Sequence, residues 1–297
     1  MKLLSKIFNI LNFLLCLIFK LFNKFASLKI FSSARFDASE KDFEIVQHKN
    51  TYFLVSTKDK LIGKEISKNG KYDFEKFEKA YELLGLCKKK SLSLIDIGAN
   101  IGSIGITALK KNLVSKCYFF EPSPLNFKIL KNNIILNDLE NNSHAYKLAL
   151  GSQKGHANLQ LSKDDFGDHR MEVGNLLHPD RKAIKVTVEE LNHFANIINP
   201  AECFIKIDTQ GYEGHVLEGA RKYTSFGTPI IMEFWPFGLN KSKGFELLQK
   251  NLSQSNYSFF IDLKDVKNKQ IDVTENNLKV LYDKIGNRGH FTDLLIF

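Results

Sequence analysis

The segment LIDIGANIGSIG, residues 94–105, constrains the fold more than any other part of this sequence. An apolar run ends in Asp96 and is followed by Gly98 and Gly102, with Asn100 between the two glycines. Such a run is typical of a buried strand. Glycines directly after it allow a tight turn into a helix, and they let a ligand approach the backbone closely. The segment therefore predicts a strand, a turn and a helix, with a ligand site at the turn.

Strands and helices alternate along most of the remaining chain. This alternation predicts a doubly wound α/β fold, in which helices cover both faces of a mostly parallel sheet. In such a sheet ligands bind beyond the carboxyl ends of the strands, close to the point where the strand order reverses. Further strands are expected in residues 116–122, 144–151, 203–211, 229–236, 257–263 and 290–297, with two extended segments in 156–162 and 182–191.

The polar residues of the glycine turn indicate which ligand it serves. A dinucleotide turn follows the pattern G-x-G-x-x-G, so that a pyrophosphate can sit at the start of the helix. Counted from Gly98, the chain has Asn100 and Ser103 where that pattern needs glycines, and the P-loop ending is also missing. Asp96 disfavours a pyrophosphate and favours a cation. S-adenosylmethionine fits, because it carries an ammonium and a sulfonium group and no phosphate.

Glu121 is the second acid that bears on the ligand. It ends the next predicted strand, 19 residues beyond Gly102, which is close to the spacing at which an acid accepts hydrogen bonds from ribose hydroxyls. Sites for dinucleotides and sites for S-adenosylmethionine both use such an acid, so Glu121 does not distinguish the two ligands. Asp96 and Asn100 together favour S-adenosylmethionine. An acid before a strand–helix turn can also act only as a helix N-cap.

A second group of charges lies in the strand predicted for residues 203–211. Lys206 and Asp208 interrupt an otherwise apolar run, and Glu233 interrupts another. These charges predict either a structural ion pair or, for Asp208 at its strand end, contact with a substrate. A hydroxyl acceptor would need a base to take its proton, and the candidates are Asp208, Glu213 and His169. We assign catalytic roles to Asp208 and Glu213, although Glu213 also suits a helix start.

With these motifs the chain resembles the FkbM family of S-adenosylmethionine-dependent methyltransferases. The matching segments are LIDIGANIGSIG, FFEPSP, FIKIDTQGYEGHVLEGA and PIIMEF. The resemblance implies the family's seven-stranded sheet and S-adenosylmethionine as cofactor. It also implies an O-methyltransferase, of a kind that often acts on sugars or natural products. We expect the acceptor to be a hydroxyl of a sugar, a glycan or a lipid-linked molecule. The cofactor-binding residues that it implies are Asp96, Gly98, Ala99, Asn100, Gly102 and Glu121.

The N-terminal segment carries most of the net charge of +9. Residues 1–35 hold six basic residues and no acid, so the remaining 36 basic and 33 acidic residues leave only +3. This distribution argues against a nucleic-acid partner. Polar residues recur every three or four positions in residues 1–30, which predicts an amphipathic helix in the plane of an anionic membrane surface. A signal peptide, a short membrane anchor and a helix packed on a protein remain alternatives.

Three regions follow from these observations. Residues 1–30 are expected to form the membrane-associating helix, residues 31–90 a cap of strands and a helix, and residues 91–297 the methyltransferase domain. The predicted location is cytoplasmic and peripheral, on the inner face of the membrane. The competing hypothesis is a membrane-tethered binding module that resembles a methyltransferase but lacks catalysis.

No metal site is expected. The cysteines are dispersed and form neither a C-x-x-C motif nor a cluster with histidines, which also suits a reducing compartment. They are Cys16, Cys87, Cys117 and Cys203.

Overall fold

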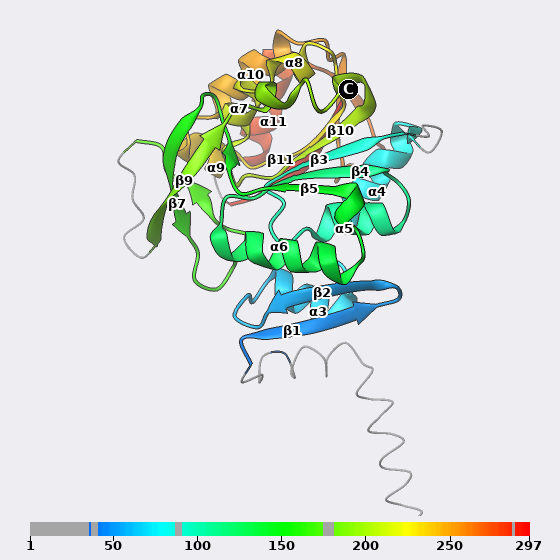
Figure 1. The fold of residues 1–297 in the computed structure, drawn as a ribbon. Coiled ribbons are helices and arrows are strands. Elements are labelled where there is room, and N and C mark those ends of the chain that lie inside the picture. Colours follow the sequence, from blue (N-terminus) through cyan, green and yellow to red (C-terminus); the bar gives the residue numbers. More distant parts are fainter. Residues whose placement is uncertain (1–35, 37–40, 87–90, 175–180, 287–288) are drawn as a thin grey trace, which may run out of the picture.

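The computed structural model describes residue 36 and residues 41–86, 91–174, 181–286 and 289–297 (Figure 1). The helix predicted for residues 1–30 lies outside these residues, so the structure does not test it. Within the described ranges, none of the helices combines the length and the apolar character that crossing a membrane requires.

The centre of the molecule is an eight-stranded sheet with the order β13-β12-β14-β11-β10-β3-β4-β5. The five strands from β11 to β5 are parallel, and β14 runs antiparallel to both of its neighbours. The predicted doubly wound fold is confirmed, and β13 adds a short edge strand to the seven that were expected. The strands are β3 (Ser93–Ile97), β4 (Lys116–Phe120), β5 (Ser143–Tyr146), β10 (Cys203–Ile207), β11 (Ile230–Phe234), β12 (Phe259–Asp262), β13 (Gln270–Asp272) and β14 (Thr292–Ile296).

Helices cover both faces of this sheet (Figure 1). Successive strand residues point to opposite faces, so Leu94 joins one apolar core and Ile95 the other. Chain order reverses at β3, which places β4 and β5 on one side of it and β10 and β11 on the other. The first core is covered by α3 (Ile62–Asn69), α4 (Phe74–Leu83), α5 (Ser103–Lys110) and α6 (Pro124–Leu136), and the second by α7 (Glu213–Glu218), α8 (Arg221–Thr224), α9 (Pro236–Lys241), α10 (Phe245–Ser253) and α11 (Glu275–Ile285).

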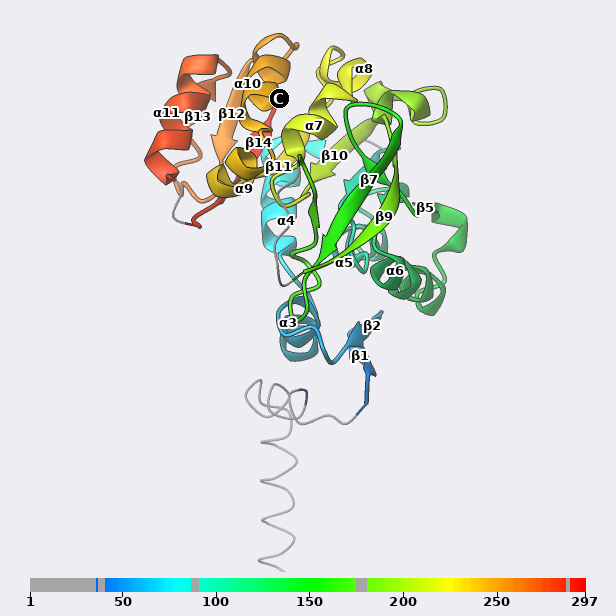
Figure 2. The same cartoon turned by 90° about the vertical axis from the view of Figure 1, so that its left-hand side faces the viewer.

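A hairpin of β1 (Phe43–His48) and β2 (Thr51–Ser56) lies against α6, within the region predicted as a cap (Figure 2). Asn133 of α6 and Asn137, the residue that caps the end of this helix, satisfy the backbone of β2 where no further strand continues the sheet. Asn137 bonds both the amide and the carbonyl of Tyr52, at 2.9 and 2.7 Å, and Asn133 does the same for Leu54, at 2.6 and 3.2 Å. This exchange fixes the register of the hairpin on the helix.

A second, four-stranded sheet has the order β6-β9-β7-β8. The single strand predicted for residues 144–151 is wrong, because that run divides into β5 in the large sheet and β6 in the small one. An apolar run has the same appearance whether it stays in one sheet or changes sheets, so periodicity does not reveal the break. The strands of the small sheet are β6 (Ala149–Leu150), β7 (Gly155–Leu161), β8 (Arg170–Met171) and β9 (Lys182–Glu189).

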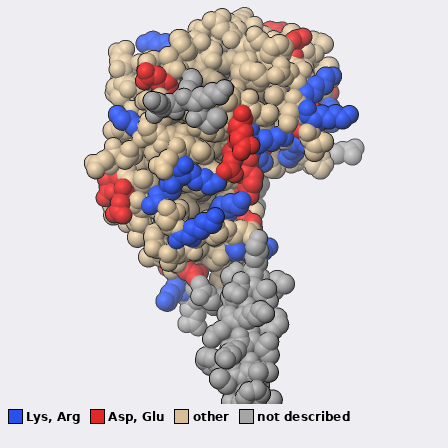
Figure 3. Space-filling view, turned by 90° about the vertical axis from the view of Figure 1, so that its right-hand side faces the viewer, with Lys and Arg blue, Asp and Glu red and all other residues tan. Residues whose placement is uncertain are grey.

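Acidic and basic side chains lie next to one another on the face drawn in Figure 3. The charges of the described surface are therefore mixed on this side of the molecule. The same intermixing appears in ion pairs such as Lys111 with Glu78, at 2.6 Å, and Lys58 with Asp42, at 2.7 Å.

Candidate active site

Two adjoining cavities open where β3, β4, β10 and β11 end, which is where a doubly wound sheet binds its ligands. We call them the Glu121 cavity and the Lys76 cavity. The turn after β3 and the turn after β10 form the wall between them. The lining residues that they share are Gly98, Asn100, Gly167 and Asp208.

The turn after β3 is the tight strand-to-helix turn that the sequence predicted. Its glycines make room for atoms of neighbouring segments of the protein. Gly98, Asn100 and Gly102 have positive φ angles of 74°, 53° and 84°. A Cβ atom on Gly98 would lie 1.8 Å from the carbonyl oxygen of Asp208, so only glycine lets the two turns touch. Gly102 is the N-cap of α5, and a Cβ atom there would lie 2.5 Å from Leu130.

Glu121 links the end of β4 to the glycine turn. One oxygen of its carboxylate accepts a bond from the backbone amide of Asn100 and the other from that of Ser123, both at 2.8 Å. Burial raises the pKa of Glu121 to about 7. Each carboxylate oxygen can accept a further hydrogen bond, and Glu121 lines the cavity that carries its name. It can therefore accept bonds from the hydroxyls of a bound ribose.

A loop between β7 and β8 closes over the glycine turn. The carbonyl oxygen of Phe166 accepts bonds from the side-chain amides of Asn100 and Asn126, at 2.8 and 2.9 Å. His169 also lines the Glu121 cavity, and its Nδ1 accepts a bond from the backbone amide of Ser162 at 3.1 Å. Burial lowers the pKa of His169 to about 4, so this candidate base binds protons weakly near neutral pH.

The rest of the Glu121 cavity is largely apolar. Neither lysine nor arginine is among its described lining residues, so a pyrophosphate would find no cation there. A flat, uncharged adenine ring suits such walls better. The apolar side chains are those of Ile97, Phe120, Pro122, Ala149, Leu150, Leu159, Phe166 and Met171.

Asp96 lies deeper than the sequence suggested. Its carboxylate is 1% exposed and faces the ammonium of Lys206 at 3.6 Å, because Asp96 and Lys206 are register partners in β3 and β10. It is not among the described residues that line either cavity, whereas its neighbour Ala99 lines the Lys76 cavity. A direct contact between Asp96 and the cofactor ammonium stays a prediction.

Asp208 lies at the meeting point of the two cavities and lines both. Its side chain is 32% exposed, and its carboxylate pairs with the ammonium of Lys206 at 3.5 Å. This is the structural ion pair that the sequence analysis offered for Lys206. Gln210 adds a contact that the sequence did not reveal. Its side-chain amide donates to Asp208 at 2.8 Å and to Glu233 at 3.2 Å, so it joins two carboxylates from neighbouring strand ends.

Glu213 is fully buried and organises the turn between β10 and α7. Its Oε1 accepts bonds from the amide and the hydroxyl of Thr209, at 2.9 and 3.0 Å, and from the amide of Gly211 at 3.2 Å. Glu213 is not among the described residues that line the two cavities. This geometry matches the alternative of an acid at a helix start, and its catalytic role stays a prediction.

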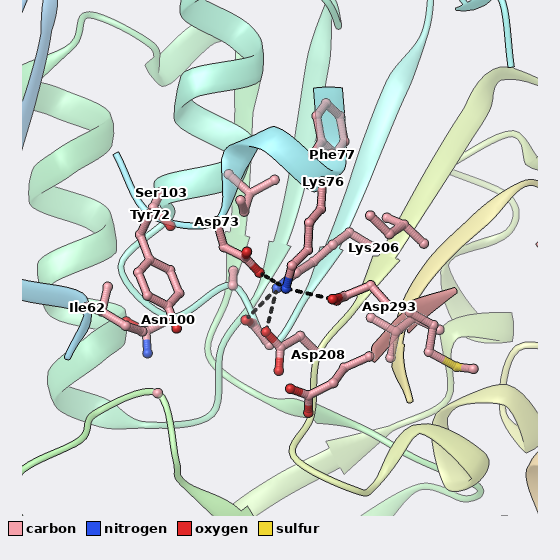
Figure 4. Close-up of a pocket in the computed structure, with 18 residues that line it drawn as sticks. Ile62, Tyr72, Asp73, Lys76, Phe77, Asn100, Ser103, Lys206, Asp208 and Asp293 are labelled. Atoms are coloured by element: carbon pink, nitrogen blue, oxygen red, sulfur yellow. Dashed lines mark hydrogen bonds and ion pairs between the residues drawn. The ribbon is translucent and has the colours of Figure 1, made fainter. Parts of the chain in front are cut away.

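The Lys76 cavity is rich in charge (Figure 4). The ammonium of Lys76, on α4, pairs with Asp73 at 2.9 Å and with Asp293 of β14 at 2.6 Å. Burial raises the pKa of Asp293 to about 6. Sequence reasoning missed this triad, because its members come from opposite ends of the chain and no motif joins them. The only signal was a lone aspartate inside the apolar run of residues 290–297.

A third cavity, the Glu75 cavity, adjoins the Lys76 cavity and shares Tyr72, Asp73, Lys76, Asp208 and Glu233 with it. Glu75 stands at its edge with a side chain that is 62% exposed, so this cavity reaches the surface. Among the described residues, no group of three or more histidine, cysteine, aspartate or glutamate side chains could hold a metal ion.

Comparisons with known proteins match the chain to methyltransferases. The sequence profile described as the methyltransferase FkbM domain matches residues 96–266. A Sordaria araneosa protein named methyltransferase sdnD is 26% identical over 191 residues, which are 52% of this chain and 73% of that protein.

Solved structures that resemble the chain are more distant. M. jannaschii TYW2, crystallised in complex with AdoMet, matches with a TM-score of 0.43 and 11% identity over 87% of this chain and 85% of that chain. Precorrin-6y C5,15-methyltransferase from Geobacter metallireducens matches with a TM-score of 0.37 and 12% identity over 74% of this chain and 86% of that chain.

Proposed function

The chain belongs to the methyltransferase FkbM domain family, and on that premise we propose that it transfers a methyl group from S-adenosylmethionine to a hydroxyl of a sugar, a glycan or a lipid-linked acceptor. One observation carries the proposal. An apolar cavity with an acid placed for ribose meets a carboxylate-lined cavity at Asp208. A methyl donor in the Glu121 cavity and an acceptor in the Lys76 cavity would meet at the wall that the two cavities share.

The described residues fit this cofactor. Glu121 retains acceptor capacity for ribose hydroxyls, and the apolar walls beside it suit adenine. Asn100 presents a side-chain oxygen that is buried and has no hydrogen-bond partner in the described structure. An amino group of a ligand could donate to that oxygen. When bound, S-adenosylmethionine supplies the methyl group on a cationic sulfur.

The acceptor side of the site favours hydroxyl groups. Carboxylates accept hydrogen bonds from hydroxyls, and one of them can also take the proton that a hydroxyl must release. Asp208 and Glu233 line both the Lys76 and the Glu75 cavities. Methyl transfer needs the oxygen, the carbon and the sulfur in line, so holding the acceptor in place contributes much of the catalysis. Asp208 is placed to do this, because Lys206 and Gln210 hold its carboxylate.

A labelling experiment tests this function. Purified protein is incubated with methyl-labelled S-adenosylmethionine and with glycan, lipid or small-molecule extracts, and the labelled product is identified. We expect the label in a methyl ether of a hydroxylated compound. Binding of S-adenosylhomocysteine without transfer to any extract would favour the binding module instead. Tight binding of NAD would contradict the cofactor assignment.

The membrane association proposed for residues 1–30 is separable from the chemistry. Its support is the presence of six basic residues and no acid in residues 1–35. Each basic residue near an anionic lipid surface contributes about 1 kcal/mol of attraction, which salt screens. The full chain should sediment with anionic vesicles at low salt and less at high salt. A chain that starts at Phe36 should remain in the supernatant and still bind S-adenosylhomocysteine. Equal sedimentation of the two would contradict the proposal.

A further inference from the structure

Methyl transfer to a hydroxyl needs a group that takes the proton, and the following inference rests on that proposed function. Four carboxylates line the Lys76 cavity, and they differ in the partners that hold them. Three of them pair with a lysine: Asp73 and Asp293 with Lys76, at 2.9 and 2.6 Å, and Asp208 with Lys206, at 3.5 Å. The fourth is Glu233, at the end of the central strand β11.

Glu233 has no lysine or arginine within ion-pair distance in the part of the chain that the structure describes. Its one side-chain hydrogen bond there comes from Gln210, which donates to Oε2 at 3.2 Å. The residue is 8% exposed, yet it lines both the Lys76 cavity and the Glu75 cavity. Its carboxylate therefore faces the space proposed for the acceptor and remains open to a hydrogen bond from a ligand hydroxyl.

The surroundings of Glu233 also make it a stronger base than an exposed glutamate. Burial raises its pKa well above the usual value, and the carboxylates of Asp208, Glu213 and Asp293 raise it further, while Lys206 lowers it. Asp293 is its direct register partner in β14. A base binds a proton more strongly as its pKa rises, and catalysis is most efficient when that pKa lies near the working pH.

We propose that Glu233 is the general base of the methyl transfer. The acceptor hydroxyl gives its proton to Glu233 as its oxygen bonds to the methyl carbon, and the electron pair of the broken carbon–sulfur bond stays on sulfur. The products are a methyl ether, a neutral thioether and a protonated Glu233. This carboxyl group then releases its proton to solvent through the Glu75 cavity. Asp208 holds the acceptor, and Gln210 positions both carboxylates.

The variant Glu233→Gln tests this assignment, because it keeps the shape of the side chain and removes its basicity. We expect turnover to fall by about 10²–10⁴-fold, the usual contribution of a general base. The Kd for S-adenosylhomocysteine should change by less than about threefold, which corresponds to well under 1.4 kcal/mol. Glu78→Gln, on an exposed surface pair with Lys111, is the matched control and should retain full turnover. Glu233→Asp, which keeps a carboxylate, should recover part of the loss.

The pH dependence of turnover distinguishes a general base at position 233 from a residue with a purely structural role. Turnover of the unaltered protein should rise with pH through the pKa of Glu233, because the base must be ionised. In Glu233→Gln this rise should disappear from the residual activity. Wild-type-like turnover in Glu233→Gln, or loss of S-adenosylhomocysteine binding equal to the loss of turnover, would overturn the assignment.

A second measurement needs neither cofactor nor activity. Infrared difference spectra of the protein alone, titrated from about pH 5 to pH 9, follow protonated carboxyl groups. We expect Glu233→Gln to lose one carboxyl group that titrates above the usual glutamate range. If no such group is lost, the base assignment fails. If the group is lost but no acceptor is ever methylated, the proposed function fails and Glu233 keeps the high proton affinity inferred here.

Discussion

The Glu121 cavity and the Lys76 cavity lie at the same edge of one sheet, and their buried charges are satisfied in different ways. Backbone amides from the adjoining turns hold Glu121, at 2.8 Å each. Side chains hold the carboxylates of the Lys76 cavity, and two of the four, Asp293 and Glu233, take their partners from distant segments. The turns that supply these backbone donors leave short motifs in the sequence, whereas Asp293 and Glu233 meet their side-chain partners only once the whole sheet has formed. The first cavity is therefore encoded by short motifs and the second by the tertiary fold.

The largest effect is expected where the cavities share a wall. In Gly98→Ala the new Cβ atom would lie 1.8 Å from the carbonyl oxygen of Asp208, at a φ of 74° that side chains rarely adopt. Overpacking and the left-handed backbone should together cost about 2–5 kcal/mol of unfolding free energy. Denaturant unfolding measures this loss, and S-adenosylhomocysteine binding should fall with it. Gly85→Ala is the control, because it has a similar φ of 62° and no atom within 4 Å of the new Cβ. Equal losses in both variants would show that backbone strain alone is responsible.

The next effect separates the Glu121 cavity from its neighbour. Glu121→Ala should weaken S-adenosylhomocysteine binding by about 1.5–3 kcal/mol, the range for a hydrogen bond to a charged group. Calorimetry measures the change. Asp293→Asn alters the other cavity and should weaken binding less than Glu121→Ala does. A larger loss in Asp293→Asn would place the main cofactor contacts in the Lys76 cavity.

A smaller effect is expected for the charge network itself. Lys76→Met leaves Asp73 and Asp293 without their shared cation. Removing one partner of a fully buried pair costs about 3–5 kcal/mol. The lysine is 25% exposed and the aspartates 38% and 12%, so solvent should reduce the loss of unfolding free energy to about 1–2 kcal/mol. The double variant Lys76→Met with Asp293→Asn should recover part of it in denaturant unfolding. No recovery would mean that the packing of the lysine stem, and not its charge, stabilises this cavity.

The smallest effect is a change in how stability against unfolding depends on pH, and it is expected at Glu213. Backbone amides hold this carboxylate, as they hold Glu121. Burial raises the pKa of Glu213 to about 7 from its ordinary value of 4.5. The folded protein therefore keeps a proton that the unfolded chain releases, and stability from this group is lost as pH rises from about 4.5 to about 7. Glu213→Gln should reduce that loss, measured by thermal unfolding across this range. An unchanged slope would indicate that Glu213 titrates normally.

Residues near one another in sequence carried most of what could be predicted. The turn at Gly98 and Asn100 and the acid Glu121 were identified from spacing, and the structure brings them together at the Glu121 cavity. Gly102, which was also predicted to bind the cofactor, is not among the described lining residues of either cavity. Strand and helix periodicity predicted the doubly wound sheet, because burial on a regular element leaves a regular pattern. The change of sheets within residues 144–151 left no such pattern and was missed.

The sequence by itself determined the class of fold, the glycine turn and the acid that faces it, since each leaves a short motif or a regular pattern of burial along the chain. Apart from the pair of Lys206 with Asp208, only the tertiary structure decided which carboxylates have cations. Register places Asp96 beside Lys206, and α4 and β14 bring Lys76 to Asp293. Glu233 has no such cation in the described structure, and no local pattern could show it. The charge state of a buried carboxyl depends on what the completed fold places within a few ångströms of it, whatever the distance along the chain.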